Sequence, residues 1–137
     1  MNRSFSVISI VVPCFNEEKG LGTLFDRLEA TLSQLADFKY EIICIDDGSR
    51  DNTLAVLCQH AARNQNIVVL EFSRNFGKEA ALTAGLDIAQ GDAIIPIDAD
   101  LQHPPELIIE MVKQWKNGYD VVLARRTSRE TDHPLQR

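Results

Sequence analysis

The chain has 137 residues, of which 45% are hydrophobic and 25% are charged, and its formal net charge is -6. This composition is typical of one globular α/β domain that is long enough to bury a core. The acidic balance offers no basic surface, so we expect no nucleic-acid partner, and any bound phosphate must be held locally. No apolar stretch approaches the roughly 20 residues that span a bilayer, so we expect this chain to be soluble. The cysteines Cys14, Cys44 and Cys58 lack metal-type spacing and are interpreted as reduced, buried residues of a cytosolic protein.

Short apolar runs alternate along the chain with segments in which apolar residues recur at helical spacing. The runs predict strands at residues 7–12, 40–45, 67–72, 93–97 and 119–124. The helical spacing predicts helices at residues 21–35, 54–61, 80–89 and 107–115. The runs at 7–12 and 93–97 are apolar on both faces, as in buried parallel strands. We expect the first of them to stop at Pro13. The alternation predicts an α/β, Rossmann-like doubly wound sheet, mostly parallel, with helices on both faces and the first strand beside the fourth.

Three residues carry more local expectations. Gly85 costs its helix about 1 kcal/mol relative to alanine, which indicates close packing against a neighbour. Gly48 suits a tight turn and Asp51 a helix cap. We expect one domain over residues 1–126, and residues 127–137, which have no apolar periodicity, to form a flexible tail.

Two carboxylates, Asp98 and Asp100, follow the strand predicted at residues 93–97. Side chains two residues apart in an extended chain point the same way, so both can converge on one cation with Ala99 turned aside, and Gln102 can join them. Hard cations such as Mg²⁺ and Mn²⁺ take oxygen ligands and often complete their shell with a substrate's phosphates. An Asp-x-Asp motif alone is a weak signal, because acidic pairs in loops are commonly solvated or cap the next helix.

The loops after the first and second strands are also polar and would open onto the same crevice, at the carboxyl ends of the strands. Phe15 could stack on a nucleotide base, and Asp47 could accept a hydrogen bond from the ring N–H of that base. Simpler interpretations stay open. Phe15 can be a core residue, Asp46 can only fix the turn that follows it, and Asn16 with Glu17 can only cap a helix.

Other ligand classes fit the motifs less well. A dinucleotide-binding turn would need three glycines after the first strand, whereas Gly20 and Gly22 are displaced and lack the third. A P-loop motif is absent from the sequence. An Asp-x-Asp phosphatase or a receiver-like phosphorylation domain would place its acid pair after the first strand. A nucleotide-sugar site fits best, and the alternatives are a dinucleotide-binding Rossmann-like domain and a non-catalytic nucleotide-binding module.

Four motifs together resemble the nucleotide-binding half of a family 2 glycosyltransferase with a GT-A fold. They are Val-Val-Pro-Cys-Phe-Asn-Glu-Glu at 11–18, Asp-Asp-Gly-Ser at 46–49, Ser-Arg-Asn-Phe-Gly-Lys-Glu at 73–79 and Asp-Ala-Asp-Leu-Gln-His-Pro-Pro-Glu at 98–106. The last two resemble the polyisoprenyl-phosphate branch, which includes dolichol-phosphate mannose synthases and, with the closest similarity, bactoprenol glucosyltransferases. The resemblance covers residues 6–126.

The resemblance implies a set of site residues. Those implied to bind the nucleotide sugar are Pro13, Phe15, Asn16, Glu17, Asp46, Asp47, Lys78, Asp98, Ala99 and Arg125. Those implied to hold Mg²⁺ or Mn²⁺ are Asp98, Asp100 and Gln102. Phe15 departs from the family pattern, which usually has tyrosine there.

The resemblance also implies a metal-dependent, inverting transfer from a nucleotide sugar, with UDP-glucose favoured over GDP-mannose, to a polyisoprenyl phosphate such as undecaprenyl phosphate. Members of the branch continue into a second half that shapes the acceptor site and into membrane-associated segments. We therefore expect this chain to be a truncated catalytic domain, inactive alone in transfer, with its catalytic residues unassigned. The full-length protein is expected at the cytoplasmic face of the inner membrane.

Overall fold

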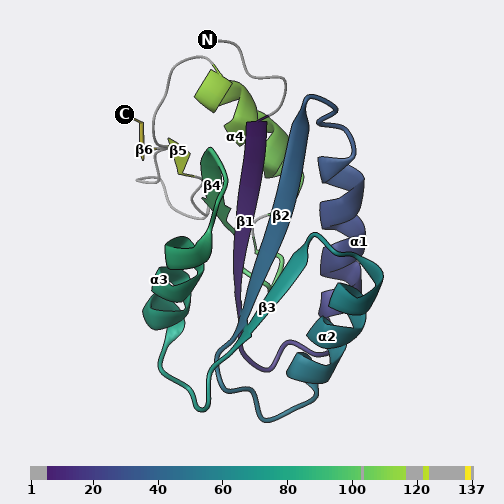
Figure 1. The fold of residues 1–137 in the computed structure, drawn as a ribbon, viewed down its shortest axis with the longest axis vertical. Helices are drawn as coiled ribbons and strands as arrows, with labels where there is room; N and C mark the ends of the chain where they lie inside the picture. Colours follow the sequence, from purple (N-terminus) through teal and green to yellow (C-terminus); the bar gives the residue numbers. More distant parts are fainter. Residues whose placement is uncertain (1–5, 103, 117–121, 124–134, 137) are drawn as a thin grey trace.

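The fold is a four-stranded parallel sheet with the strand order β3-β2-β1-β4 (Figure 1). The computed structural model describes residues 6–102, 104–116, 122–123 and 135–136. The strands of the sheet are β1 (Ser6–Cys14), β2 (Phe38–Asp46), β3 (Ile67–Glu71) and β4 (Ala93–Pro96). The order reverses at β1, which pairs in parallel with both β2 and β4. The predicted switch point between the first and fourth strands is confirmed.

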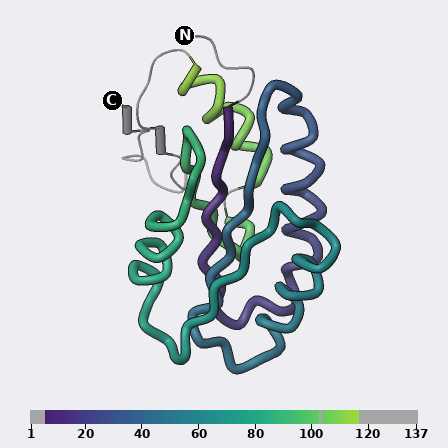
Figure 2. Tube along the Cα trace, in the orientation of Figure 1, coloured from purple at the N-terminus to yellow at the C-terminus, as the bar shows by residue number. Residues whose placement is uncertain are grey.

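Helices cover both faces of the sheet, as expected for a doubly wound fold (Figure 1). One face carries α1 (Leu21–Leu32), α2 (Thr53–Arg63) and α4 (Leu107–Lys116), and the other carries α3 (Lys78–Ile88). The trace in Figure 2 shows that α1 connects β1 to its neighbour β2 and α2 connects β2 to its neighbour β3, whereas α3 carries the chain from β3 across the sheet to β4 beside β1. No helix in the described part of the chain is long and apolar enough to cross a bilayer.

The larger core lies between the sheet and the three helices of the first face. Leu24, Phe25 and Leu28 of α1 are fully buried against strand residues such as Ile10 and Ile42. Each fully buried side chain of this size contributes about 1.5–3 kcal/mol. The positions follow the helical spacing read from the sequence, although α1 ends at Leu32 rather than at residue 35.

The smaller core lies under α3. Ala81 packs against Val11 and Ile45, and Gly85 lies so close to the sheet that an added Cβ would be 2.5 Å from Val11 Cγ1. The close packing predicted from Gly85 is confirmed. A small residue at this position lets the helix axis approach the sheet.

Three sequence expectations need correction. Strand β1 does not stop at Pro13 but continues to Cys14, because pairing with β4 ends opposite Val11 and proline tolerates a strand with a partner on one side only. Cys58 is exposed on α2, whereas Cys14 and Cys44 are buried. Strand β4 is an edge strand of the described sheet, so Ile94 is 39% exposed instead of buried.

The C-terminal predictions are tested only in part. Of the strand expected at residues 119–124, the structure describes β5 (Val122–Leu123), which pairs antiparallel with β6 (Leu135–Gln136). The rest of the tail expected at 127–137 lies outside the described residues, as does Arg125.

Candidate functional site

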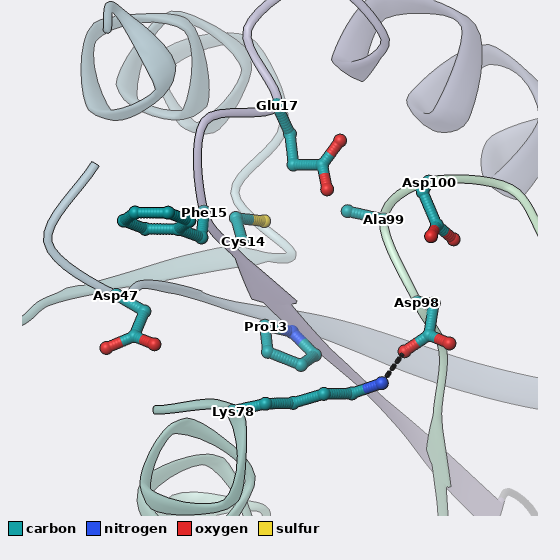
Figure 3. Close-up of a pocket in the computed structure, with 9 residues that line it drawn as sticks. All are labelled: Pro13, Cys14, Phe15, Glu17, Asp47, Lys78, Asp98, Ala99 and Asp100. Atoms are coloured by element: carbon teal, nitrogen blue, oxygen red, sulfur yellow. Dashed lines mark ion pairs between the residues drawn. The ribbon is translucent and has the colours of Figure 1, made fainter. Parts of the chain in front are cut away.

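A pocket of about 170 Å³ opens at the carboxyl ends of β1, β2 and β4, next to the first residue of α3 (Figure 3). Figure 3 shows Phe15 and Asp47 at one end of this pocket and Asp98 and Asp100 at the other. Its lining residues are Pro13, Cys14, Phe15, Glu17, Asp47, Lys78, Asp98, Ala99 and Asp100. The structure therefore gathers most of the site residues expected from the sequence.

Phe15 follows the end of β1 and is 41% exposed, so it is not a core residue. Its ring lies at the pocket, where an exposed aromatic face can stack on a planar ligand. Cys14, beside it, is buried, and burial raises the pKa of its thiol well above the usual range. The thiol is therefore neutral and serves as a small apolar lining group.

The loop after β1 is held by the loop after β2 and does not cap α1, whose N-cap residue is Gly20. Asn16 adopts a positive φ of 54°, and its side-chain oxygen accepts the N–H of Arg50 at 2.8 Å. Three successive backbone N–H groups of this loop also donate to side chains of the β2–α2 loop and of the first residue of α2. They are Asn16 N–H to Ser49 Oγ at 2.9 Å, Glu17 N–H to Thr53 Oγ1 at 2.8 Å and Glu18 N–H to Asp51 Oδ2 at 3.3 Å.

Asp51 acts as the predicted cap in a slightly different way. The N-cap residue of α2 is Asn52, which makes no side-chain capping bond. The carboxylate of Asp51 accepts the N–H of Thr53 at 2.9 Å and its hydroxyl at 2.5 Å. Desolvation is the largest single effect on the pKa of Asp51 and raises it. The hydrogen bonds together outweigh desolvation, so the pKa is lowered.

Asp46, the last residue of β2, and Asp47, which follows it, make different contacts. Asp46 is buried, does not line the pocket, and accepts the N–H of Ser49 at 3.2 Å, so it fixes the turn. Gly48 has a φ of 71° in that turn, and an added Cβ would lie 2.3 Å from the backbone of the loop at residues 74–75. The simpler interpretation of Asp46 as a turn-fixing residue therefore matches its contacts, and the turn predicted at Gly48 is confirmed.

Asp47 lines the pocket and also holds the loop before α3. One carboxylate oxygen accepts the N–H of Phe76 at 2.8 Å. The other accepts the N–H of Gly77 at 3.1 Å and the side-chain amide of Asn75 at 3.2 Å. This role was missed in the sequence, because the donors lie about 30 residues further along the chain and no local pattern links them to Asp47.

Asp98 and Asp100 lie in the loop after β4, and the Ala99 methyl group points away from their carboxylates (Figure 3). Ala99 is 3% exposed and packs in the core, so its side chain is turned aside from the two acids as expected, although residues 99–100 form a turn and not an extended strand. Leu101 has a φ of 64°, a strained conformation for leucine, and this bend brings the N–H of Gln102 to Asp100 Oδ1 at 3.1 Å. The side chain of Gln102 does not line the pocket, and its predicted role as a ligand stays a prediction.

Negative charge accumulates at the pocket. Burial raises the pKa of Glu17, and the charges of Asp100, Asp51 and Asp98 raise it further. Among the described lining residues, Lys78 is the one basic side chain, and its ammonium group forms an ion pair with Asp98 Oδ1 (Figure 3). The net negative charge of this lining disfavours an anionic ligand unless further positive charge is bound with it.

The donor set fits a hard divalent cation. No group of three or more His, Cys, Asp or Glu side chains is arranged as a metal centre among the described residues. A magnesium-type site needs only one or two carboxylates when substrate phosphates supply the remaining oxygens. Asp98 and Asp100 provide those carboxylates, and Asp98 already holds a cationic group in the Lys78 ammonium.

Comparison with known proteins identifies the family. The model described as Glycosyl transferase family 2 matches residues 9–136. The chain is 55% identical over 123 residues to an uncharacterized glycosyltransferase of Synechocystis sp., which covers 90% of this chain and 38% of that protein. It is 48% identical over 130 residues to a prophage bactoprenol glucosyl transferase homolog of Escherichia coli, which covers 95% of this chain and 42% of that protein. The chain thus spans about two fifths of the length of these relatives.

A solved structure supports the fold independently. A mannosyltransferase from Pyrobaculum calidifontis, in complex with GDP-Man and Mn²⁺, superposes with a TM-score of 0.66 at 23% identity, covering 80% of this chain and 32% of that one. The likeness shows the fold, which is the GT-A glycosyltransferase fold. The family and the fold expected from the sequence motifs are both confirmed.

Proposed function

Because this chain belongs to glycosyl transferase family 2, we propose that it binds a nucleoside diphosphate sugar as the donor of a sugar transfer. The observation that supports this most is the arrangement of the pocket. An exposed aromatic ring, Phe15, lies at one end, and two strand-end carboxylates, Asp98 and Asp100, lie at the other. This order suits a base, a ribose and a diphosphate in sequence.

Each end of the pocket has a proposed role. Phe15 stacks on the base, and Asp47 accepts a hydrogen bond from the ring N–H while it holds the loop before α3. Asp98 and Asp100, joined by Gln102, hold Mg²⁺ or Mn²⁺. The bound metal would stabilise the charge that develops on the departing nucleoside diphosphate.

UDP-glucose is the proposed donor, with GDP-mannose as the alternative, and a polyisoprenyl phosphate such as undecaprenyl phosphate is the proposed acceptor. The relative named as a bactoprenol glucosyl transferase homolog supports this choice. The oxygen of a lipid phosphate is already anionic near neutral pH, so in-line attack with inversion needs no strong general base. We place acceptor-binding residues and membrane attachment, at the cytoplasmic face of the inner membrane, in regions of the full-length protein beyond this chain.

Calorimetric titration tests the donor site. The 137-residue chain is titrated with UDP-glucose, GDP-mannose and NAD, with and without Mn²⁺. We expect UDP-glucose to bind in the presence of Mn²⁺, and NAD not to bind. Asp98→Asn and Asp100→Asn should each weaken Mn²⁺-dependent binding by roughly tenfold or more, since even outer partners of a metal contribute 10- to 100-fold. Asp87→Asn, the same charge change on an exposed residue of α3 away from the pocket, is the control.

Undiminished Mn²⁺-dependent affinity in both pocket variants would refute the metal assignment, and binding of NAD in preference to both sugar nucleotides would refute the donor class. Transfer is measured with radiolabelled UDP-glucose, Mn²⁺ and undecaprenyl phosphate, by following label into the organic phase. We expect no transfer by this chain and transfer by the chain extended to the length of its relatives. Label found only in soluble sugars with the extended protein would refute the lipid-phosphate acceptor.

A further inference from the structure

Lys78 lines the pocket from α3, the helix on the face of the sheet opposite α1, α2 and α4. It is the first residue of α3, and its side chain runs past Pro13 to Asp98 (Figure 3). Its position is set by the loop before it, because Asp47 holds the N–H groups of Phe76 and Gly77. The side chain of Lys78 is 59% exposed and that of Asp98 is 25% exposed, so the pair lies at the mouth of the pocket and not in the core.

The ion pair uses the carboxylate that would also ligate a metal. Lys78 contacts Asp98 Oδ1, and a divalent cation bound to the same carboxylate would repel this ammonium group. In the metal-free protein Lys78 thus partly neutralises a pocket that also contains Glu17, Asp47 and Asp100. A cation that binds the Asp98 carboxylate therefore weakens this ion pair and favours displacement of the ammonium group.

The displaced ammonium group has a second anion within reach. A lysine side chain has four flexible methylene groups, and Lys78 starts from the N-terminus of α3, whose free N–H groups favour negative charge. A diphosphate held at Asp98 through a metal would lie beside this helix end. Lys78 can then exchange a carboxylate for a phosphate without leaving the pocket mouth.

We propose that Lys78 couples metal binding to nucleotide binding, by occupying Asp98 in the metal-free protein and moving to the diphosphate when the cation is bound. The proposal rests on the proposed donor site. Its consequence is that a metal ion alone binds weakly, since it weakens the ion pair without gaining a new partner for the ammonium group. Metal and nucleoside diphosphate together bind more tightly than the two separate affinities predict.

The test measures Mn²⁺ binding alone, from the electron paramagnetic resonance signal of free Mn²⁺, and then repeats it with saturating UDP. The proteins are the wild-type chain, Lys78→Gln and Lys113→Gln. Lys113 is exposed on α4, outside the pocket, so its variant carries the same charge change without the ion pair. In Lys78→Gln we expect Mn²⁺ alone to bind roughly tenfold tighter than in the wild type. The factor by which saturating UDP increases the Mn²⁺ affinity should fall by a similar amount, which is near the low end of coupling between two binding sites. Lys113→Gln should match the wild type.

The outcomes separate this proposal from the donor site itself. If the wild type binds Mn²⁺ and UDP but Lys78→Gln has the wild-type affinity for Mn²⁺ alone, the exchange is refuted and the donor site stands. If Mn²⁺ binds more weakly to Lys78→Gln, Lys78 supports the metal position and the proposal is also refuted. If the wild type binds neither Mn²⁺ nor UDP, the donor site fails and the coupling with it.

Discussion

Asp47 joins the end of β2 to the loop before α3, and Asp47→Asn tests how far the shape of the site depends on this connection. Its carboxylate accepts hydrogen bonds from Phe76 N–H, Gly77 N–H and the Asn75 amide. An asparagine side chain keeps one accepting oxygen but turns an NH₂ group, itself a donor, toward the remaining donors. At least one charge-assisted hydrogen bond is therefore lost, and a donor faces a donor.

The magnitude follows from the burial of Asp47 and from its charge. The residue is 3% exposed, so water replaces the lost partner poorly. A hydrogen bond to a charged group contributes about 1.5–3 kcal/mol, so we expect Asp47→Asn to lower the free energy of unfolding by about 2–4 kcal/mol. Urea unfolding followed by circular dichroism measures this loss. Asp37→Asn, on an exposed turn, is the matched control and should change the free energy by less than about 0.5 kcal/mol.

A second variant separates stability from recognition. Asn75→Ala loosens the same loop but leaves the Asp47 carboxylate in place. If Asp47 also binds the base, Asp47→Asn should weaken UDP binding by about 1.5–3 kcal/mol more than Asn75→Ala does. Equal losses of UDP affinity would confine Asp47 to holding the loop. An unfolding free energy for Asp47→Asn within about 0.5 kcal/mol of the wild-type value would refute the structural role itself.

Two further predictions concern charge and backbone. The raised pKa of Glu17 means that the folded protein binds this proton more tightly than the unfolded chain, so stability falls as pH rises above the ordinary pKa of 4.5 and the penalty persists at neutral pH. Glu17→Gln should raise the melting temperature of the metal-free chain at pH 7 by roughly 1–4 °C and leave it unchanged near pH 4, and a gain that is equal at both pH values would contradict the charge explanation. Gly48→Ala forces a φ of 71° on alanine and a Cβ 2.3 Å from backbone, so we expect a loss of about 3 kcal/mol or more in urea unfolding. Gly22→Ala, in α1 with nothing within 4 Å of the added Cβ, should instead stabilise by about 0.5–1 kcal/mol, and similar losses at both glycines would remove the steric argument.

Features encoded over a few residues could be predicted from the sequence. The strand-end acids, the turn at Gly48 and the tight packing at Gly85 each follow from one residue type in a local pattern. The pocket itself could be anticipated because parallel strands bring their carboxyl ends to one edge of a sheet. In this way Phe15, Asp98 and Asp100 were placed together although they lie in distant parts of the sequence.

Features that depend on pairing between distant segments could not be predicted. Pro13 belongs to β1 because β4 is short, which its own neighbours in the sequence do not reveal. Cys58 is exposed because α2 buries the face that carries Leu57, and His60 on that helix stacks on Phe25 at 4.4 Å between ring centroids. The Lys78–Asp98 ion pair joins two motifs recognised separately, and only the crossing of α3 over the sheet brings them together.

The backbone N–H groups of residues 16–18, next to Phe15, are protected from solvent although they lie in a loop. Each donates to a side chain of the β2–α2 loop or of the first residue of α2, so we expect these amides to exchange with water only when the two segments separate. A ligand that stacks on Phe15 therefore meets a segment that is already ordered. We therefore expect the entropic cost of binding at Phe15 to be small, and the conformational adjustment to fall on the flexible side chain of Lys78 at the opposite end of the pocket.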